Sequence, residues 1–246
     1  MASKKPNVVV LFPDQLRAQS LPLYGTDALR EDQIETPNIE RLAARGVRLD
    51  NAFSNCPVCT PARAMLVTGR YPQSTGHLIN STRTRHSEIS IADAFAHAGY
   101  RTGWVGKWHL HTGHWPALDR MPMQPDWVPK GRDRLGFDYW RAYNQHMVYF
   151  DGFVQKGDWN YERWDGYETD GLLNYAFEFM DEAKDDPFLL FVSPPPASLH
   201  TREVCARPVL RAVAGDADTP GECTRAAAGT VDRDVPALSG DDPRDR

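Results

Sequence analysis

Two runs of consecutive apolar residues constrain the fold of this chain more than any other feature. One lies in residues 7–12 (NVVVLF), where five apolar residues follow Asn7, and the other spans residues 188–192 (FLLFV). Neither run alternates with polar residues, which is typical of strands that are buried on both faces of a sheet. Such strands need helices on both sides. The sequence therefore predicts an α/β fold with a mainly parallel sheet flanked by helices.

Helix signals lie between these two runs. Each expected helix begins at a capping Ser or Thr and ends at a glycine, and the three ranges are 36–46, 60–69 and 90–99. Residues 100–105 are expected to form a strand that leads into a loop, and a further helix is expected from Thr169. The stretch 112–167, rich in Trp, Tyr, Gly, Asp and Pro, has no clear period and predicts a long irregular excursion.

The tryptophans and tyrosines of that excursion leave two interpretations open. They could form an aromatic wall for a sugar or an aryl group. They could also pack a large irregular segment, which is the commoner use of such residues. The residues concerned are Trp115, Trp127, Trp140, Tyr143, Trp159 and Trp164.

The amino-acid composition changes abruptly near residues 196–201. Every Phe, Trp and Tyr lies at or before Phe191, and no Ile, Met, Lys, Asn or Gln occurs from Thr201 onward. A stretch of this kind buries little area against its ordering entropy. We therefore predict a catalytic region over residues 1–196 and an atypical Ala/Arg/Asp/Pro-rich tail over 197–246. The tail is either disordered or the product of a shifted reading frame.

Charge and hydropathy exclude several classes of protein. The formal net charge is −5, which argues against nucleic-acid binding. No apolar run has the roughly 20 residues that a membrane helix needs. Residues 1–5 are not followed by the apolar core of a signal peptide, so a cytoplasmic location is expected. Cys56 and Cys59 have the C-x-x-C spacing of redox and zinc sites, but no second pair accompanies them.

One segment brings reactive groups together. Cys59 precedes a helix that is expected to start at Thr60-Pro61, where free backbone N–H groups favour an anion. Arg63 lies in the first turn and can reach the same place. A sulfur, a fixed cation and a helix N-terminus therefore converge on a volume that suits an anion.

Several motifs in a fixed order resemble the type I sulfatases, the formylglycine-dependent arylsulfatase family of the alkaline-phosphatase-like superfamily. Residues 59–63 (CTPAR) with 68–72 (TGRYP) are similar to the first signature of that family, and residues 100–109 (YRTGWVGKWH) are similar to the second. A strand that ends in Asp14-Gln15 precedes both. The resemblance covers about residues 5–196 and implies an alkaline-phosphatase-like fold that is apparently truncated.

The resemblance implies hydrolysis of sulfate monoesters, either aryl or carbohydrate. A formylglycine-generating enzyme would recognise C-x-P-x-R and oxidise Cys59 to Cα-formylglycine, whose hydrate attacks the sulfur. A divalent cation, Ca²⁺ rather than Mg²⁺, would neutralise the charge of the ester through hard oxygen ligands. No nucleic acid or membrane partner is implied.

The resemblance also assigns residues to roles. Asp14, Gln15 and the modified Cys59 match metal ligands. Arg63 would steady the modified Cys59, Lys107 would contact the nucleophile and the sulfate, and His109 would sit beside them. His200 would be a displaced form of the family histidine that binds the sulfate or protonates the leaving oxygen.

The second half of the family pattern is missing, because residues 201–246 contain no Asp-His-Gly or Asp-Asn-Gly segment to complete a metal site. Three hypotheses follow. The chain is a sulfatase catalytic domain, a phosphonate or phosphate monoester hydrolase of the same superfamily, or an incomplete and inactive remnant.

Overall fold

The computed structural model describes residues 5–24, 35–111, 127–146, 148–157 and 160–195. His200 lies outside these ranges, as do Trp115, Trp159 and the whole of the expected tail. No described helix is long and apolar enough to cross a membrane.

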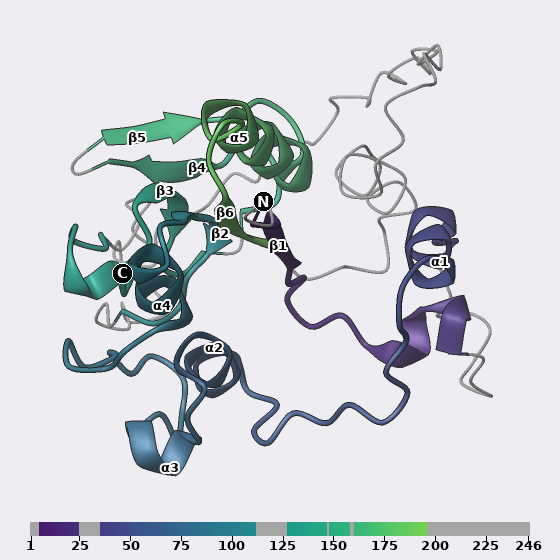
Figure 1. The fold of residues 1–246 in the computed structure, drawn as a ribbon, viewed down its shortest axis with the longest axis horizontal. Coiled ribbons are helices and arrows are strands. Elements are labelled where there is room, and N and C mark those ends of the chain that lie inside the picture. The colour runs from purple at the N-terminus through teal and green to yellow at the C-terminus, as the bar shows by residue number, and fades with distance from the viewer. Residues whose placement is uncertain (1–4, 25–34, 112–126, 147, 158–159, 196–246) are drawn as a thin grey trace, which may run out of the picture. The chain divides into compact units, whose positions relative to one another are not determined.

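The six described strands form one mixed sheet in the order β1-β6-β2-β3-β4-β5 (Figure 1). The first four in this order run parallel, and β4 and β5 pair antiparallel at the far edge. The strands are β1 (Val8–Leu11), β2 (Arg101–Lys107), β3 (Tyr139–Tyr143), β4 (Phe153–Lys156), β5 (Asn160–Arg163) and β6 (Phe188–Ser193). This confirms the predicted α/β class with a mainly parallel sheet.

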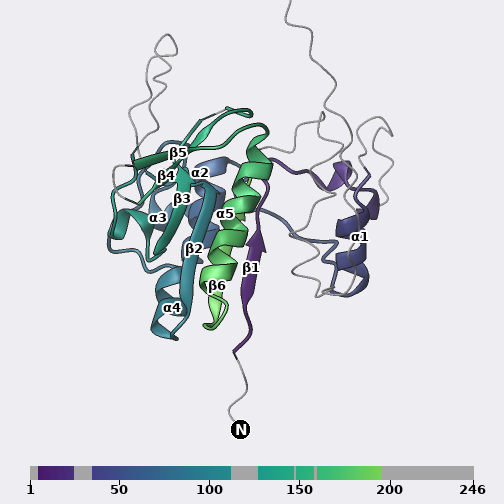
Figure 2. The ribbon, with the colours of Figure 1, turned by 90° about the horizontal axis from the view of Figure 1, so that it is seen from above.

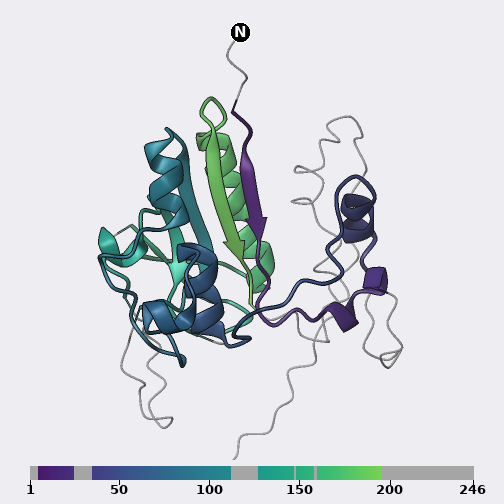
Figure 3. The ribbon, with the colours of Figure 1, turned by 60° about the horizontal axis from the view of Figure 1, so that its bottom comes forward.

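Helices cover both faces of the sheet (Figures 2 and 3). α2 (Cys59–Thr68) and α4 (Ile91–His97) pack on one face, where Trp104, Trp108 and Trp140 form the centre of the core. α5 (Glu168–Glu182) packs on the other face through Leu172, Ala176 and Phe179. The remaining α-helices of the described residues are α1 (Pro37–Ala44) and the single turn α3 (Pro72–Thr75).

The start of α4 and the end of α2 agree with the capping signals in the sequence. α4 has a complete capping box, in which the Ser90 side chain accepts from the Asp93 backbone N–H and the Asp93 carboxylate accepts from the Ser90 N–H. α2 ends at Gly69, whose φ of 67° is the left-handed conformation that glycine adopts without strain. These local signals therefore predicted the helices on the face that carries Cys59.

The strands differ from the predictions in three respects. β1 is only half-buried, because it lies at an edge of the described sheet and not inside it. β2 extends to Lys107, whereas a loop was expected from Gly106. The excursion expected over 112–167 was wrong for its described part, because β3, β4 and β5 belong to the sheet.

Several aromatic residues of that segment are core residues. Trp140 and Tyr143 are almost completely buried in β3, and Trp164 is buried against α5. Trp140 also packs edge-to-face on Trp108. The packing interpretation is therefore confirmed for these three side chains.

Gly106 allows β2 and β6 to approach closely near the carboxyl end of the sheet. It lies opposite Ser193 with a φ of +96°, and a Cβ atom added there would lie 2.1 Å from the Ser193 carbonyl oxygen. No side chain fits in that space. A glycine is therefore required one residue before Lys107.

Candidate active site

The carboxyl ends of three parallel strands meet at one edge of the sheet. Asp14 follows β1, Lys107 is the last residue of β2, and Ser193 is the last residue of β6. The Asp14 N–H donates to the Pro194 carbonyl at 3.1 Å, which fixes the segment after β1 against the end of β6. Sites in open α/β sheets gather at this edge.

Arg63 of α2 links the three strand ends. Its side chain is completely buried, and its guanidinium donates to Asp14 Oδ1 at 3.1 Å, to Ser193 Oγ at 2.9 Å and to the Lys107 carbonyl at 2.5 Å. The Phe12 ring also lies 5.2 Å from the guanidinium carbon. Arg63 is therefore fixed in one orientation by contacts from β1, β2 and β6.

Asp14 lies between two cations. Lys107 Nζ is 2.7 Å from Asp14 Oδ2, and both side chains are buried, as is Arg63 on Oδ1. Burial raises the pKa of Asp14, but the charges and hydrogen bonds of Arg63 and Lys107 lower that pKa by more, so it ends below its usual value. The carboxylate is ionised, and the three side chains together carry one net positive charge.

Cys59 lies beside this group. Its half-buried Sγ is 3.9 Å from Lys107 Nζ and 4.0 Å from Asp14 Oδ2. The structure thus brings together four of the residues that the sequence assigned to the site, from an N-terminal strand, a helix and a central strand. Asp14, Cys59 and Lys107 are separated by more than forty residues from one another along the chain.

The start of α2 differs from the prediction. The helix begins at Cys59 itself, with Val58 as its N-cap residue. Fewer free backbone N–H groups therefore lie beside Cys59 than the sequence predicted. The Thr60 N–H donates to Asn80 Oδ1 at 2.9 Å, and Pro61 has no N–H. The positive potential beside Cys59 therefore comes mainly from Lys107 and Arg63.

His109 is buried two residues beyond β2 in a left-handed backbone conformation, with a φ of 57°. Its N–H donates to the Asn144 carbonyl and its own carbonyl accepts from Thr60 Oγ1, both at 2.9 Å. Burial, together with the charges of Lys107 and Arg63, lowers the pKa of His109 to about 3. The imidazole is therefore neutral near pH 7, and it adds no charge to the site.

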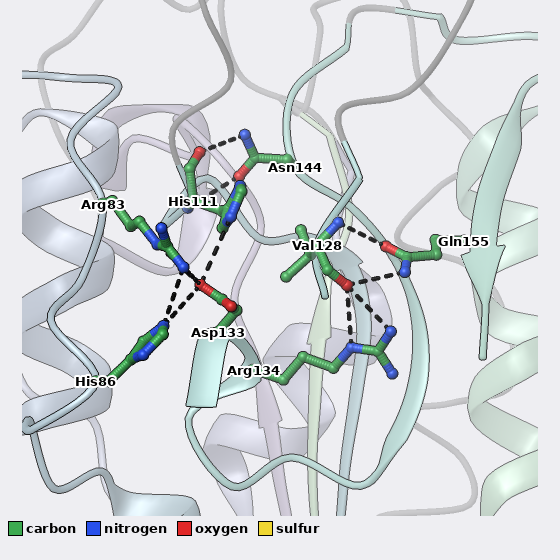
Figure 4. A network of polar contacts seen from close by, with 8 residues as sticks. All are labelled: Arg83, His86, His111, Val128, Asp133, Arg134, Asn144 and Gln155. Carbon is green, nitrogen blue, oxygen red and sulfur yellow. Dashed lines mark hydrogen bonds and ion pairs between the residues drawn. The ribbon is translucent and has the colours of Figure 1, made fainter. Parts of the chain in front are cut away.

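A polar network holds the residues that follow His109 (Figure 4). The Asn144 side chain accepts from the His111 N–H at 3.1 Å and donates to the His111 carbonyl at 2.5 Å. The His111 ring faces Asp133, which also contacts Arg83 and His86. The backbone that carries His109 and His111 is therefore fixed on both sides.

The remaining residues of the predicted site are not brought together in this way. Gln15 is exposed and has a φ of 57°. His200 lies outside the described residues. Among the residues that the structure describes, no group of three or more His, Cys, Asp or Glu side chains could hold a metal ion.

The described donors do not by themselves fit a divalent cation. Asp14 is their one carboxylate at the site, and both of its oxygens face a cation, Arg63 or Lys107. Ca²⁺ usually takes six to eight oxygen ligands, and a second positive charge here would be repelled by Lys107. A metal site at this edge would need donors beyond those described.

Ser193, Asn80 and Asn144 support the site, but the sequence analysis did not identify them as site residues. Ser193 was open to prediction, because it is the polar residue that directly follows a buried apolar run at the functional edge of the sheet. Asn80 and Asn144 carry no local signal, since their partners Thr60 and His111 are distant in sequence. Tertiary contacts alone give these two side chains their roles.

Comparison with known proteins gives a consistent result. A family model described as Sulfatase matches residues 6–218. The ulvan-active sulfatase of Formosa agariphila is 36% identical over 197 residues, which are 77% of this chain and 35% of that protein. Human arylsulfatase A is 38% identical over 117 residues, covering 45% of this chain and 22% of that protein.

Solved structures share the fold. A Bacteroides fragilis crystal structure superposes with a TM-score of 0.70 at 25% identity, covering 89% of this chain and 49% of the other. Another, solved in complex with its substrate D-glucosamine-2-N,6-O-disulfate, gives a TM-score of 0.62 at 26% identity over 78% of this chain and 34% of the other. The chain spans about a third of the length of the first curated relatives that it matches.

Proposed function

Because this chain belongs to the sulfatase family, we propose that its site serves the hydrolysis of sulfate monoesters, with Cys59 as the precursor of the nucleophile. The observation that carries the proposal is the placement of Cys59 Sγ 3.9 Å from the ammonium group of Lys107, beside a fully buried Arg63. A sulfate monoester is an anion that repels nucleophiles. Fixed cations beside the attacking atom reduce that repulsion.

The formylglycine that the family uses would supply an oxygen nucleophile at position 59. Lys107 is within reach of an oxygen at that position, and its ammonium protons can hydrogen-bond both that oxygen and an oxygen of the sulfate. Arg63 holds Asp14, Ser193 and the end of β2 in place, so Lys107 is presented in one orientation. Preorganised charge of this kind needs no rearrangement during the reaction.

His109 is proposed to act as a neutral hydrogen-bonding group beside the nucleophile or the sulfate. Its pKa of about 3 leaves the ring uncharged at the pH of most cells. A neutral imidazole has one N–H donor and one acceptor nitrogen, so it can hold a hydroxyl proton without adding charge. His200 is proposed as a second histidine of the site, as the sequence predicts.

A divalent cation is proposed as part of the complete site. Asp14, Gln15 and the oxygens of a modified Cys59 are hard donors from two separate segments, which suits Ca²⁺ better than Mg²⁺ because Mg²⁺ demands near-ideal octahedral geometry. The described residues do not complete this site, and we derive no step through the metal. The missing donors are proposed to correspond to the part of the relatives' length that this chain does not span.

The proposed substrate is a sulfate ester of a carbohydrate or an aryl alcohol. Relatives include an ulvan-active sulfatase and an N-acetylglucosamine-6-O-sulfatase, and others are named arylsulfatases. The proposed modifying partner is a formylglycine-generating enzyme that reads the segment 59–63. Thr60, Pro61 and Arg63 are buried in α2, so this enzyme would act before the helix packs.

Mass spectrometry of the peptide around Cys59 tests the nucleophile. The chain is co-expressed with a formylglycine-generating enzyme, and we expect the thiol to be replaced by an aldehyde at Cys59 and retained at Cys56. Cys56→Ala is the matched control, since Cys56 is also a free cysteine in the described structure but is not assigned to the site. An unmodified Cys59 under these conditions would contradict the proposal.

Turnover of an aryl sulfate and of the matching aryl phosphate tests the reaction. Sequencing of the gene across the codons for residues 194–201 first establishes whether the reading frame continues into the rest of the family pattern. The protein encoded by such an uninterrupted reading frame is called the continuous protein below. We expect it to hydrolyse the sulfate, and we expect Cys59→Ala to abolish that activity. Preference for the phosphate would favour a phosphate or phosphonate monoester hydrolase, and loss of both activities would indicate a remnant.

A further inference from the structure

His109 has a backbone conformation that a histidine seldom adopts. Its φ of 57° places it in the left-handed region, and its side chain is only 3% exposed. A non-glycine residue in this region costs free energy and persists when surrounding contacts hold it there. The contacts that hold His109 therefore determine where its ring lies.

Thr60 supplies one of these contacts. Its hydroxyl donates to the His109 carbonyl at 2.9 Å and accepts from the Ser81 N–H at 3.2 Å. Its own N–H donates to Asn80 Oδ1 at 2.9 Å, and the side chain is completely buried. Because Ser81 occupies a lone pair of the hydroxyl and Asn80 fixes the backbone, the Thr60 hydroxyl proton has one defined direction.

We propose that Thr60 is a positioning residue, which holds His109 in its left-handed conformation through the hydroxyl. Thr60 directly follows Cys59, so the same residue sets the distance between the proposed nucleophile and the ring of His109. The second contact on His109, from its N–H to the Asn144 carbonyl, fixes the other side of the peptide. The consequence for catalysis rests on the proposed function, whereas the effect on the His109 backbone does not.

Substitution of Thr60 in the 246-residue chain tests the backbone effect. Thr60→Val keeps the shape of the side chain and removes the hydroxyl, and Thr60→Ser keeps the hydroxyl. Thr102→Val is the matched control, because Thr102 is equally buried and its hydroxyl also donates to a carbonyl, that of Gly136, and accepts from an N–H, that of Asp138. Thr102 lies near the opposite end of β2.

Two nuclear magnetic resonance measurements report on His109. In Thr60→Val we expect the His109 amide to exchange with solvent about tenfold faster relative to the Trp108 amide, in line with the loss of one buried hydrogen bond. We also expect its Cα chemical shift to move away from the left-handed value. Thr60→Ser and Thr102→Val should change neither. Thr60→Ala, compared with Thr60→Ser, makes the same comparison if the valine variant does not fold.

An unchanged His109 in Thr60→Val, or the same change in Thr102→Val, would overturn the proposal. In the continuous protein, Thr60→Val should lower kcat for an aryl sulfate about tenfold, corrected for the converted fraction of Cys59, with little change in KM, and Thr60→Ser should restore it. A chain without sulfatase activity that still shows the change in His109 refutes the proposed function and leaves the role of Thr60 standing.

Discussion

Two residues at the functional edge of the sheet have the same backbone angle and opposite surroundings. Gln15 follows β1 and His109 follows β2, and each has a φ of 57°. His109 is buried and held by Thr60 and Asn144, whereas Gln15 is exposed. The backbone beyond β2 is therefore held by hydrogen bonds on both sides of His109, while beyond β1 the buried Asp14 is followed directly by an exposed residue.

The difference separates two kinds of chemistry. The two cations and the cysteine lie together around Asp14, and their contacts are made by described residues of this chain. Two of the proposed metal ligands, Asp14 and Gln15, follow β1, where the described residues offer a single carboxylate that Arg63 and Lys107 already neutralise. Binding of the anionic group is thus better supported by these residues than binding of a metal.

The largest expected effect comes from Arg63, which links the ends of β1, β2 and β6. Arg63→Ala removes a buried cation that contacts Asp14, Ser193 and the end of β2. We expect the free energy of unfolding to fall by about 3–5 kcal/mol, because Asp14 and Ser193 lose a buried partner. Urea unfolding measures this, with Arg48→Ala as a control: Arg48 pairs with Asp50 at the surface, and its loss should change little.

If Arg63→Ala proved no more destabilising than Arg48→Ala, the strand ends would not depend on this contact.

The sequence singled out Arg63 because C-x-P-x-R and the helix signals are local. It predicted Asp14 and Lys107 through the order of motifs, but nothing local placed Lys107 inside β2. β3 was missed because Arg141, a buried charge in the middle of YWRAY, and the absence of alternation conceal a strand that is buried throughout.

A smaller effect should follow from protonation at the end of β2. His109 has a pKa of about 3 in the folded chain and an ordinary pKa near 6.5, so below pH 6.5 the unfolded chain binds the proton more readily. The stability contributed by neutral His109 is therefore complete above pH 6.5 and decreases as the pH falls. We expect His109→Asn, which tolerates the left-handed conformation, to reduce this loss by about 2–3 kcal/mol at about pH 4.5.

Urea unfolding from pH 4.5 to 7.5 makes the comparison. Parallel curves for the wild type and His109→Asn would contradict this prediction, because they would show that folding does not lower the pKa of His109. His146 also has a pKa lowered by burial, to about 4, and remains in both proteins, so the difference between them isolates His109.

Glu168 should give the opposite pH dependence of stability, because its pKa is raised in the folded chain whereas that of His109 is lowered. It is buried, and burial raises its pKa to about 8, while the neighbouring Tyr143 and the charge of Lys107 lower that pKa by less. Below its ordinary pKa of 4.5 the folded chain keeps the full benefit of the neutral acid, which is lost as the pH rises toward 8. Glu168→Gln should therefore stabilise the chain by about 2 kcal/mol at pH 8 and by little at pH 4.5.

The midpoints of thermal unfolding of the wild type and of Glu168→Gln, measured at both pH values, test this expectation. A stabilisation that is equal at both would mean that Glu168 is ionised in the folded chain or that packing, not protonation, causes the effect. Glu35→Gln serves as the control, because Glu35 is exposed.

The smallest expected effect is at the end of β1. Gln15→Gly places a glycine at a φ of 57°, where it is unstrained, and the exposed Gln side chain gives up no buried contact. The relief of strain exceeds the added freedom of the unfolded chain, so we expect a gain of about 0.5 kcal/mol in the free energy of unfolding. A loss of stability in urea unfolding would show that the Gln15 side chain contributes contacts as His109 does.

Gly106 separates the demands of architecture from those of chemistry. The Ser193 carbonyl fills the space where any side chain at 106 would begin. A library of variants screened only for soluble, protease-resistant protein should keep Gly106 as strictly as a library selected for growth on a sulfate ester. Cys59 should be retained in the second library alone. The two positions would then serve as references for deciding which neighbouring residues are required for folding and which for reactivity.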